Sequence, residues 1–115
     1  MRYALLIYGD ETADTEATEE QNVAVMEAYT AFGEHYKDKI LMSVGPLLPT
    51  SSATTVRLRD GKTLTTDGPF AETKEQLGGW YLVKCDTLDE ATEIAAHIPG
   101  AANGSIEVRP VMEFD

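Results

Sequence analysis

The chain has 115 residues, of which 20 are acidic and 9 are basic, so its formal net charge at pH 7 is −11. Residues 1–115 are enough for a single domain with one core, and a hydrophobic share of 43% suits a soluble globular protein. Such a charge repels nucleic-acid phosphates and anionic membrane surfaces, which excludes direct binding to either. No apolar run approaches the ~18 residues of a membrane span.

The N-terminal segment is basic and then apolar, as the start of a signal peptide is. Its apolar stretch is short, and Gly9-Asp10-Glu11 follows without a small-residue cleavage site, so residues 2–8 predict a first strand. Without a targeting segment, the expected location is the cytoplasm. Cys85 is the single cysteine, which excludes an internal disulfide and a cysteine-based metal cluster.

The first half of the chain predicts a strand, a loop and a long helix. Residues 2–8 form a nearly continuous apolar run, typical of a central strand covered on both faces. A polar loop over 9–17 leads to a helix that begins near Glu16 or at the capping box Thr18-Glu19-Glu20-Gln21 and runs to about Lys37. Helical spacing predicts its buried stripe, namely Val25, Tyr29, Phe32 and Tyr36, with Met26 at the edge.

The remaining segments predict further strands, a hairpin and a second helix. Asp60-Gly61 is the strongest hairpin signal, and Gly78-Gly79 indicates a bulge or a close approach of backbone or ligand. The expected elements are a strand over 40–45, an irregular loop over 47–52, hairpin strands over 53–59 and 62–66, a strand over 78–85, a helix from Thr87 to Pro99-Gly100, and a strand over 105–114.

This order of elements predicts the fold. Two β-α-β units with right-handed crossovers give an antiparallel sheet with both helices on one face, which is the α+β, ferredoxin-like (split β-α-β) plan. Two helices cannot cover both faces of such a sheet. We therefore expect a homodimer in which the two uncovered faces stack on each other.

The segment 67–75, with the sequence Asp-Gly-Pro-Phe-Ala-Glu-Thr-Lys-Glu, has the densest chemistry in the chain. Asp-Gly-Pro is a strong turn signal, because aspartate bonds its own backbone, glycine allows positive φ and proline fixes φ. A simple turn does not need the aromatic, charged and hydroxyl residues that follow. The segment therefore predicts a small-molecule site, and the alternative is a well-formed connection between two strands.

Asp67 and His35 are the candidate catalytic residues. If Asp67 accepts a proton, directly or through His35, the expected reaction is proton abstraction or elimination from a small organic acid. The alternative for His35 is a residue at the surface or at an interface of its helix, without a catalytic role. His35 and His97 lack a close carboxylate spacing, so we expect no metal site, and the sequence predicts no cofactor.

Five further residues are candidates for binding the substrate. Phe70 and Trp80 would exclude water from the site. Lys74 and Arg109 are the cations available for a substrate carboxylate, although Lys74 reads equally well as half of a solvated surface pair. Tyr8, at the end of the first strand, offers a hydroxyl group to a cleft or packs in the core.

The segment 67–75, together with Gly-Gly-Trp-Tyr at 78–81 and Gly-Ser-Ile-Glu-Val-Arg-Pro at 104–110, resembles the YCII-related family, in the branch named for its DGPF motif. The resemblance covers nearly the whole chain and implies a dimeric α/β barrel of ferredoxin-like subunits. Asp67 matches the aspartate of that motif. A His–Asp active site has been proposed in YCII-type members, and His35 is the candidate histidine here.

The resemblance leaves two functions open. Some relatives act as small-molecule enzymes, including a dehydrochlorinase, which implies a small organic ligand near the motif. Others are encoded with, or fused to, extracytoplasmic-function sigma factors, which implies a non-catalytic regulatory module associated with a sigma factor. The strong negative charge would suit a basic face on such a partner.

Overall fold

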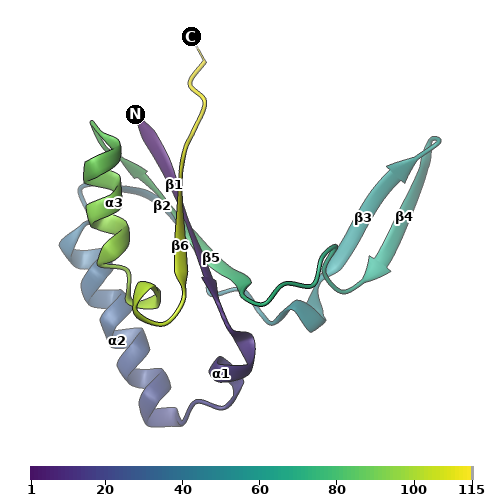
Figure 1. Ribbon diagram of the computed structural model, residues 1–115, viewed down its shortest axis with the longest axis horizontal. Coiled ribbons are helices and arrows are strands. Elements are labelled where there is room, and N and C mark those ends of the chain that lie inside the picture. The colour runs from purple at the N-terminus through teal and green to yellow at the C-terminus, as the bar shows by residue number, and fades with distance from the viewer. Residues whose placement is uncertain (115) are drawn as a thin grey trace.

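The computed structural model describes residues 1–114 as a four-stranded antiparallel sheet, helices packed on one face of it, and a separate two-stranded hairpin (Figure 1). The elements in chain order are β1 (Arg2–Gly9), α1 (Glu11–Thr15), α2 (Glu19–His35), β2 (Ile40–Val44), η1 (Thr50–Ser52), β3 (Thr54–Arg59), β4 (Lys62–Asp67), β5 (Gln76–Lys84), α3 (Leu88–Ala96), η2 (Pro99–Ala102) and β6 (Ser105–Pro110).

The strands of the large sheet lie in the order β2-β5-β1-β6, and every neighbouring pair is antiparallel. Each helical crossover therefore skips one strand, since β5 lies between β1 and β2, and β1 lies between β5 and β6. The predicted α+β class with an antiparallel sheet is confirmed, and the arrangement is compatible with the ferredoxin-like plan. The homodimer stays a prediction.

The hydrophobic core lies between the sheet and the two longer helices. Leu5 of β1 and Val83 of β5 are completely buried at its centre. From α2, Phe32 packs its ring 5.0 Å from that of Tyr81, centroid to centroid. From α3, the buried side chains are Ala91, Ile94 and Ala95. Each large apolar side chain removed from water here contributes roughly 1.5–3 kcal/mol to folding.

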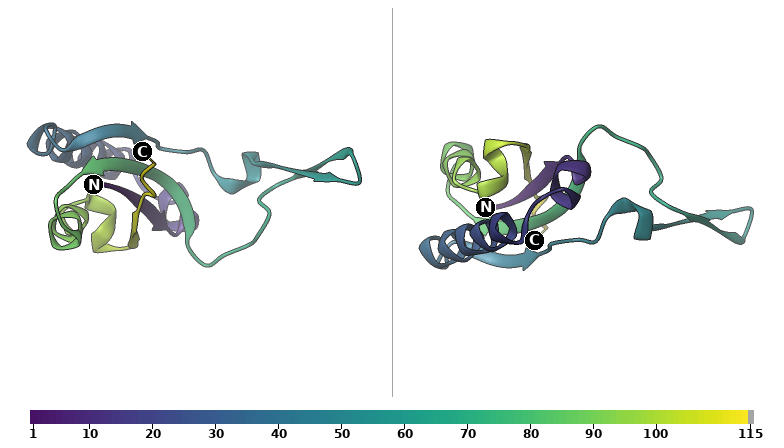
Figure 2. Two further views of the ribbon diagram at one scale, coloured as in Figure 1. Left: turned by 90° about the horizontal axis from the view of Figure 1, so that it is seen from above. Right: turned by 90° about the horizontal axis from the view of Figure 1, so that it is seen from below.

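The opposite face of the sheet has no helix over it within one chain (Figure 2). Side chains alternate along a strand, so this uncovered face carries Ala4, Leu6, Met42, Val44, Trp80 and Leu82. The prediction that β1 is central is confirmed. The prediction that both of its faces are covered is wrong for the single chain, because both α2 and α3 pack on the same side.

The buried stripe of α2 is shorter than its spacing predicts. Phe32 is buried and Tyr29 and Tyr36 pack against the core, but Val25 is 52% exposed and Met26 is 70% exposed. The helix meets the sheet only through its C-terminal half, so side chains near its N-terminus remain in solvent. The predicted capping box at Thr18 is confirmed.

The segment 9–17, expected as a loop, contains the short helix α1. Asp10 caps it, because its carboxylate accepts a hydrogen bond from the Thr12 amide at 2.9 Å. β6 ends at Pro110, earlier than the predicted boundary at 114, after which only the Val111 amide continues the pairing by donating to the Arg2 carbonyl. Among residues 1–114, no helix is long and apolar enough to span a membrane.

Candidate functional site

The β3–β4 hairpin carries Asp67 away from the sheet. Its turn is Asp60-Gly61, where both residues have positive φ, 52° and 75°, as the sequence predicts. Asp67 is the last residue of β4 and pairs with Thr54. Its side chain is exposed, and no residue within 1–114 donates a hydrogen bond to its carboxylate.

Gly68 turns the chain out of the hairpin. Its φ of 96° is a conformation that residues with a Cβ rarely adopt. Its amide donates to the Ala53 carbonyl at 2.6 Å, and its own carbonyl accepts a hydrogen bond from the Thr55 hydroxyl at 2.8 Å. The motif therefore closes the base of the hairpin, and the turn predicted from Asp-Gly-Pro is real.

A hydrogen-bond network joins this base to the rest of the protein. The Glu11 carboxylate accepts hydrogen bonds from both the amide and the hydroxyl of Thr50, at 2.6 and 2.8 Å. The Glu11 amide donates to the Gln76 side-chain oxygen at 3.0 Å, and the Gln76 amide group donates to the Thr73 carbonyl at 2.5 Å. Segments α1, η1, the motif and β5 are thus held together through one carboxylate and one amide.

A small cavity lies beside this network, and we call it the hairpin-base cavity. Its volume is about 340 Å³, at the lower end of the range of small-molecule sites. The lining offers hydroxyl and amide groups and a single charged group, the carboxylate of Glu72. The lining residues are Thr50, Ser51, Pro69, Ala71, Glu72, Thr73 and Gln76. These groups suit a small polar molecule that is recognised by hydrogen bonds.

The structure does not bring Asp67 and His35 together within one chain. His35 ends α2, and the Ile40 strand that follows pairs with Val83 near the C-terminal end of β5. Asp67 lies on the hairpin side, beyond Gln76 at the opposite end of the same strand (Figure 1). β5 alone is roughly 25 Å long. His35 is exposed, and its ring lies edge-on to the Tyr36 ring at 4.6 Å.

The five predicted binding residues fall into two groups. Trp80 pairs with Leu6, and Arg109 pairs with Ala4, so both lie on the uncovered face of the sheet, as does Tyr8. Arg109 forms an ion pair with Glu107. Phe70 and Lys74 lie in the motif segment, where Phe70 is 80% exposed, and neither lines the cavity.

The sequence reading missed Glu11, Thr50 and Gln76. Glu11 lies in the segment 9–17, for which the sequence predicts only a polar loop, and its partner Thr50 is 39 positions away. The one local signal is the run Thr50-Ser51-Ser52 after Pro49, which concentrates hydroxyl groups in a segment barred from regular pairing. Nothing in the spacing of these residues indicates that they meet.

The groups with displaced pKa values lie away from the cavity. Burial raises the pKa of the Cys85 thiol and the pKa values of Tyr29 and Tyr81. A hydrogen bond from Lys39 lowers the pKa of the Glu90 carboxyl. None of these side chains lines the cavity. Within residues 1–114, no three His, Cys, Asp or Glu side chains gather as a metal site would require.

Fold and cavity together define a class: a small α+β domain with an antiparallel sheet and a polar cavity at the base of a projecting hairpin.

The family model of the YCII-related domain matches residues 1–115. An uncharacterized protein from Rhizobium meliloti (strain 1021) is 43% identical over 114 residues, which cover 96% of this chain and 92% of the relative. The chain therefore belongs to the YCII-related family, as its motifs predict.

Proposed function

We propose that the chain is the subunit of a homodimer that binds a small polar molecule in the hairpin-base cavity. The observation that carries the proposal is the cavity itself. One of its walls is fixed by the two hydrogen bonds from Thr50 to Glu11, and another by the bond from Gln76 to Thr73. A polar, concave surface with hydrogen-bonded walls suits recognition of a ligand better than it suits a plain connection between strands.

The uncovered face of the sheet supports the homodimer. It presents Trp80, Leu82, Leu6 and Met42, which are apolar and only partly shielded in one chain. Burying this face against a second copy would remove that surface from water by the same stacking that builds β-sandwiches. It would also enclose Tyr8 and Arg109, two of the predicted ligand-binding residues.

Asp67 is the proton acceptor that we propose for a reaction at this cavity. It lies two residues from Pro69, which lines the cavity, and its carboxylate is open to solvent. In a proton abstraction, the carboxylate would take a proton from carbon next to a substrate carboxylate. The electron pair left on that carbon would then form a double bond and expel the leaving group. Lys74, in the same segment, is the cation available for the substrate carboxylate.

Ligand titrations on three variants test this function. Small carboxylates and halogenated acids are titrated into the wild type while its thermal unfolding is followed. A ligand present at 100 times its Kd stabilises the folded state by about 2.7 kcal/mol. We expect Ala71→Trp, which fills the cavity, to abolish the shift. We expect Asp67→Asn to abolish turnover while binding is retained.

Asp60→Asn is the matched control, because it removes a carboxylate from the same hairpin at a position where asparagine tolerates positive φ. It should leave both binding and turnover unchanged. Binding that survives Ala71→Trp would remove the ligand from this cavity. A wild type that no compound stabilises would contradict the proposal as a whole.

A further inference from the structure

Beyond its base, the β3–β4 hairpin projects away from the rest of residues 1–114 (Figure 1). Within residues 1–114 its strands pair only with each other, as a separate two-stranded sheet. Leu64 on one face is 48% exposed, and Val56 and Leu58 on the other face are 61% and 66% exposed. A lone two-stranded hairpin is at best marginally stable in water, so an apolar one needs a surface to pack on. Figures 1 and 2 place it on the opposite side of the sheet from α2 and α3. Any such surface therefore belongs to another molecule.

One face of this hairpin is basic. Arg57 lies opposite Leu64, and Arg59 lies opposite Lys62, so these four side chains share a face, which we call the basic face. It holds three of the nine basic residues of a chain with net charge −11. A basic face with an apolar centre would be attracted to an acidic surface with an apolar centre.

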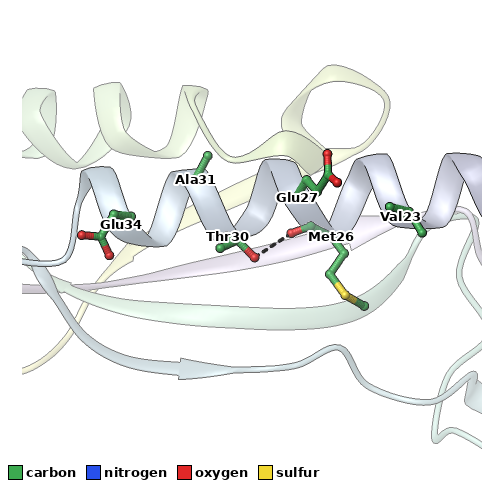
Figure 3. Close-up of a pocket in the computed structure, with 6 residues that line it drawn as sticks. All are labelled: Val23, Met26, Glu27, Thr30, Ala31 and Glu34. Atoms are coloured by element: carbon green, nitrogen blue, oxygen red, sulfur yellow. Dashed lines mark hydrogen bonds between the residues drawn. The ribbon is translucent and has the colours of Figure 1, made fainter.

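The chain itself has such a surface on the outer side of α2 (Figure 3). It is a shallow and widely open depression along a single helix, which we call the α2 groove, lined by Val23, Met26, Glu27, Thr30, Ala31 and Glu34. Val23 and Met26 supply exposed apolar surface that the core does not use. Glu34 already pairs with Lys37 at 3.0 Å, whereas Glu27 forms no ion pair within residues 1–114.

We propose that the hairpin is an arm that reaches across the homodimer and docks its basic face in the α2 groove of the second copy. The inference rests on the proposed homodimer. Stacked sheets lie ~10 Å apart, and helices pack about as far again behind each sheet, so the axis of the partner's α2 lies ~20 Å from the first sheet and its outer side ~25 Å. A six-residue strand spans ~20 Å, and the segments 45–53 and 68–75 that join the hairpin to the sheet supply the remaining reach. By two-fold symmetry, two arms would fill two grooves.

Charge reversal provides the first test, with the dimer Kd measured by sedimentation equilibrium. We expect Arg57→Glu and Glu27→Arg each to raise the Kd about tenfold or more, since each places like charges in contact. Combining the two reversals should recover most of that loss. Glu93→Arg on α3 is the control for Glu27→Arg, because it makes the same charge change on the other helix, and its Kd should not change.

Engineered disulfides provide the second test, because Cys85 is buried and does not compete. The double variant Leu64→Cys/Ala31→Cys should form a cross-linked dimer under mild oxidation. Thr65→Cys/Ala31→Cys is the control, because Thr65 neighbours Leu64 on the opposite face of the strand and should cross-link poorly.

The outcomes separate the arm from the homodimer. A wild type that stays monomeric contradicts the proposed dimer and the arm together. If the protein dimerises but neither charge reversal changes the dimer Kd, the arm is contradicted and the homodimer is not. The same conclusion follows if the Thr65 control cross-links as well as the Leu64 variant.

Discussion

Glu90 is one of the carboxyl groups whose pKa is displaced by an ion pair, here with Lys39. The Lys39 ammonium lies 2.8 Å from the Glu90 carboxylate and joins the start of α3 to the segment before β2. Its hydrogen bond lowers the pKa of Glu90 below the ordinary value of 4.5, and the charge of the ammonium adds to the effect. Folding therefore favours the ionised carboxyl, so the pair stabilises the folded state above that ordinary value.

The expected result is a stability difference that depends on pH. Glu90→Gln should be less stable than the wild type near neutrality. The difference should shrink as the pH falls below the ordinary value of 4.5 and vanish once the carboxyl is also neutral in the folded wild type. Urea unfolding of both proteins across pH 3 to 7 measures it. A difference that persists unchanged at the acid end would mean that packing, not charge, sets the effect of the substitution.

Two glycines allow a matched test of backbone packing. A Cβ at Gly104 would lie 2.1 Å from the Tyr8 carbonyl oxygen, so the loop before β6 depends on the missing side chain. Gly33, inside α2, has no neighbour within 4 Å of such an atom. We expect Gly104→Ala to destabilise the fold by about 1–3 kcal/mol. Gly33→Ala should stabilise it by roughly 0.5–1 kcal/mol. Denaturant unfolding of each variant measures these changes in the free energy of unfolding. Equal changes in the two variants would contradict the conclusion that a side chain at position 104 clashes with the Tyr8 carbonyl.

At the scale of elements, Glu11 joins the base of the hairpin to the sheet. Replacing its carboxylate in Glu11→Ala removes both hydrogen bonds from Thr50. Hydrogen bonds to charged groups contribute about 1.5–3 kcal/mol each to local stability. We expect amide exchange to quicken at Thr50 and Gln76 while the amides of β1 stay protected. Exchange that quickens throughout the sheet would show that the network supports the global fold instead.

The sequence predicts the elements well where a local rule decides them. Asp60-Gly61 places the hairpin turn, and Thr18 places the start of α2, because both depend on neighbours within three residues. The buried stripe of α2 is predicted less well. Helical spacing shows which residues share a side, but only the sheet's position decides that Phe32 is buried and Met26 is exposed.

The candidate site follows the same division at the scale of the whole molecule. The motif around Asp67 could be found in the sequence because turn chemistry concentrates Asp, Gly and Pro. The partners that shape its cavity could not, since Glu11 and Thr50 meet only after the chain has folded. Pairing Asp67 with His35 required knowing which end of β5 each lies near, and spacing along the chain carries no such information.

A tryptophan on the uncovered face of the sheet allows the proposed dimer interface to be measured. Trp80 is the single tryptophan and lies on this face, so its fluorescence reports on what covers it. If a second copy stacks there, dilution should shift the emission of Trp80 to longer wavelength at the concentration where light scattering detects monomers. Leu82→Lys places a charge on the same face and should give a monomer with red-shifted emission at every concentration.

Leu88→Lys is the control, because Leu88 lies on α3, away from that face, and its side chain is open to solvent. It should dimerise as the wild type does. An emission maximum that is independent of concentration in a protein that does dissociate would place the interface elsewhere. Because the reach of the hairpin arm to the α2 groove depends on stacked sheets, that result would contradict the arm as well.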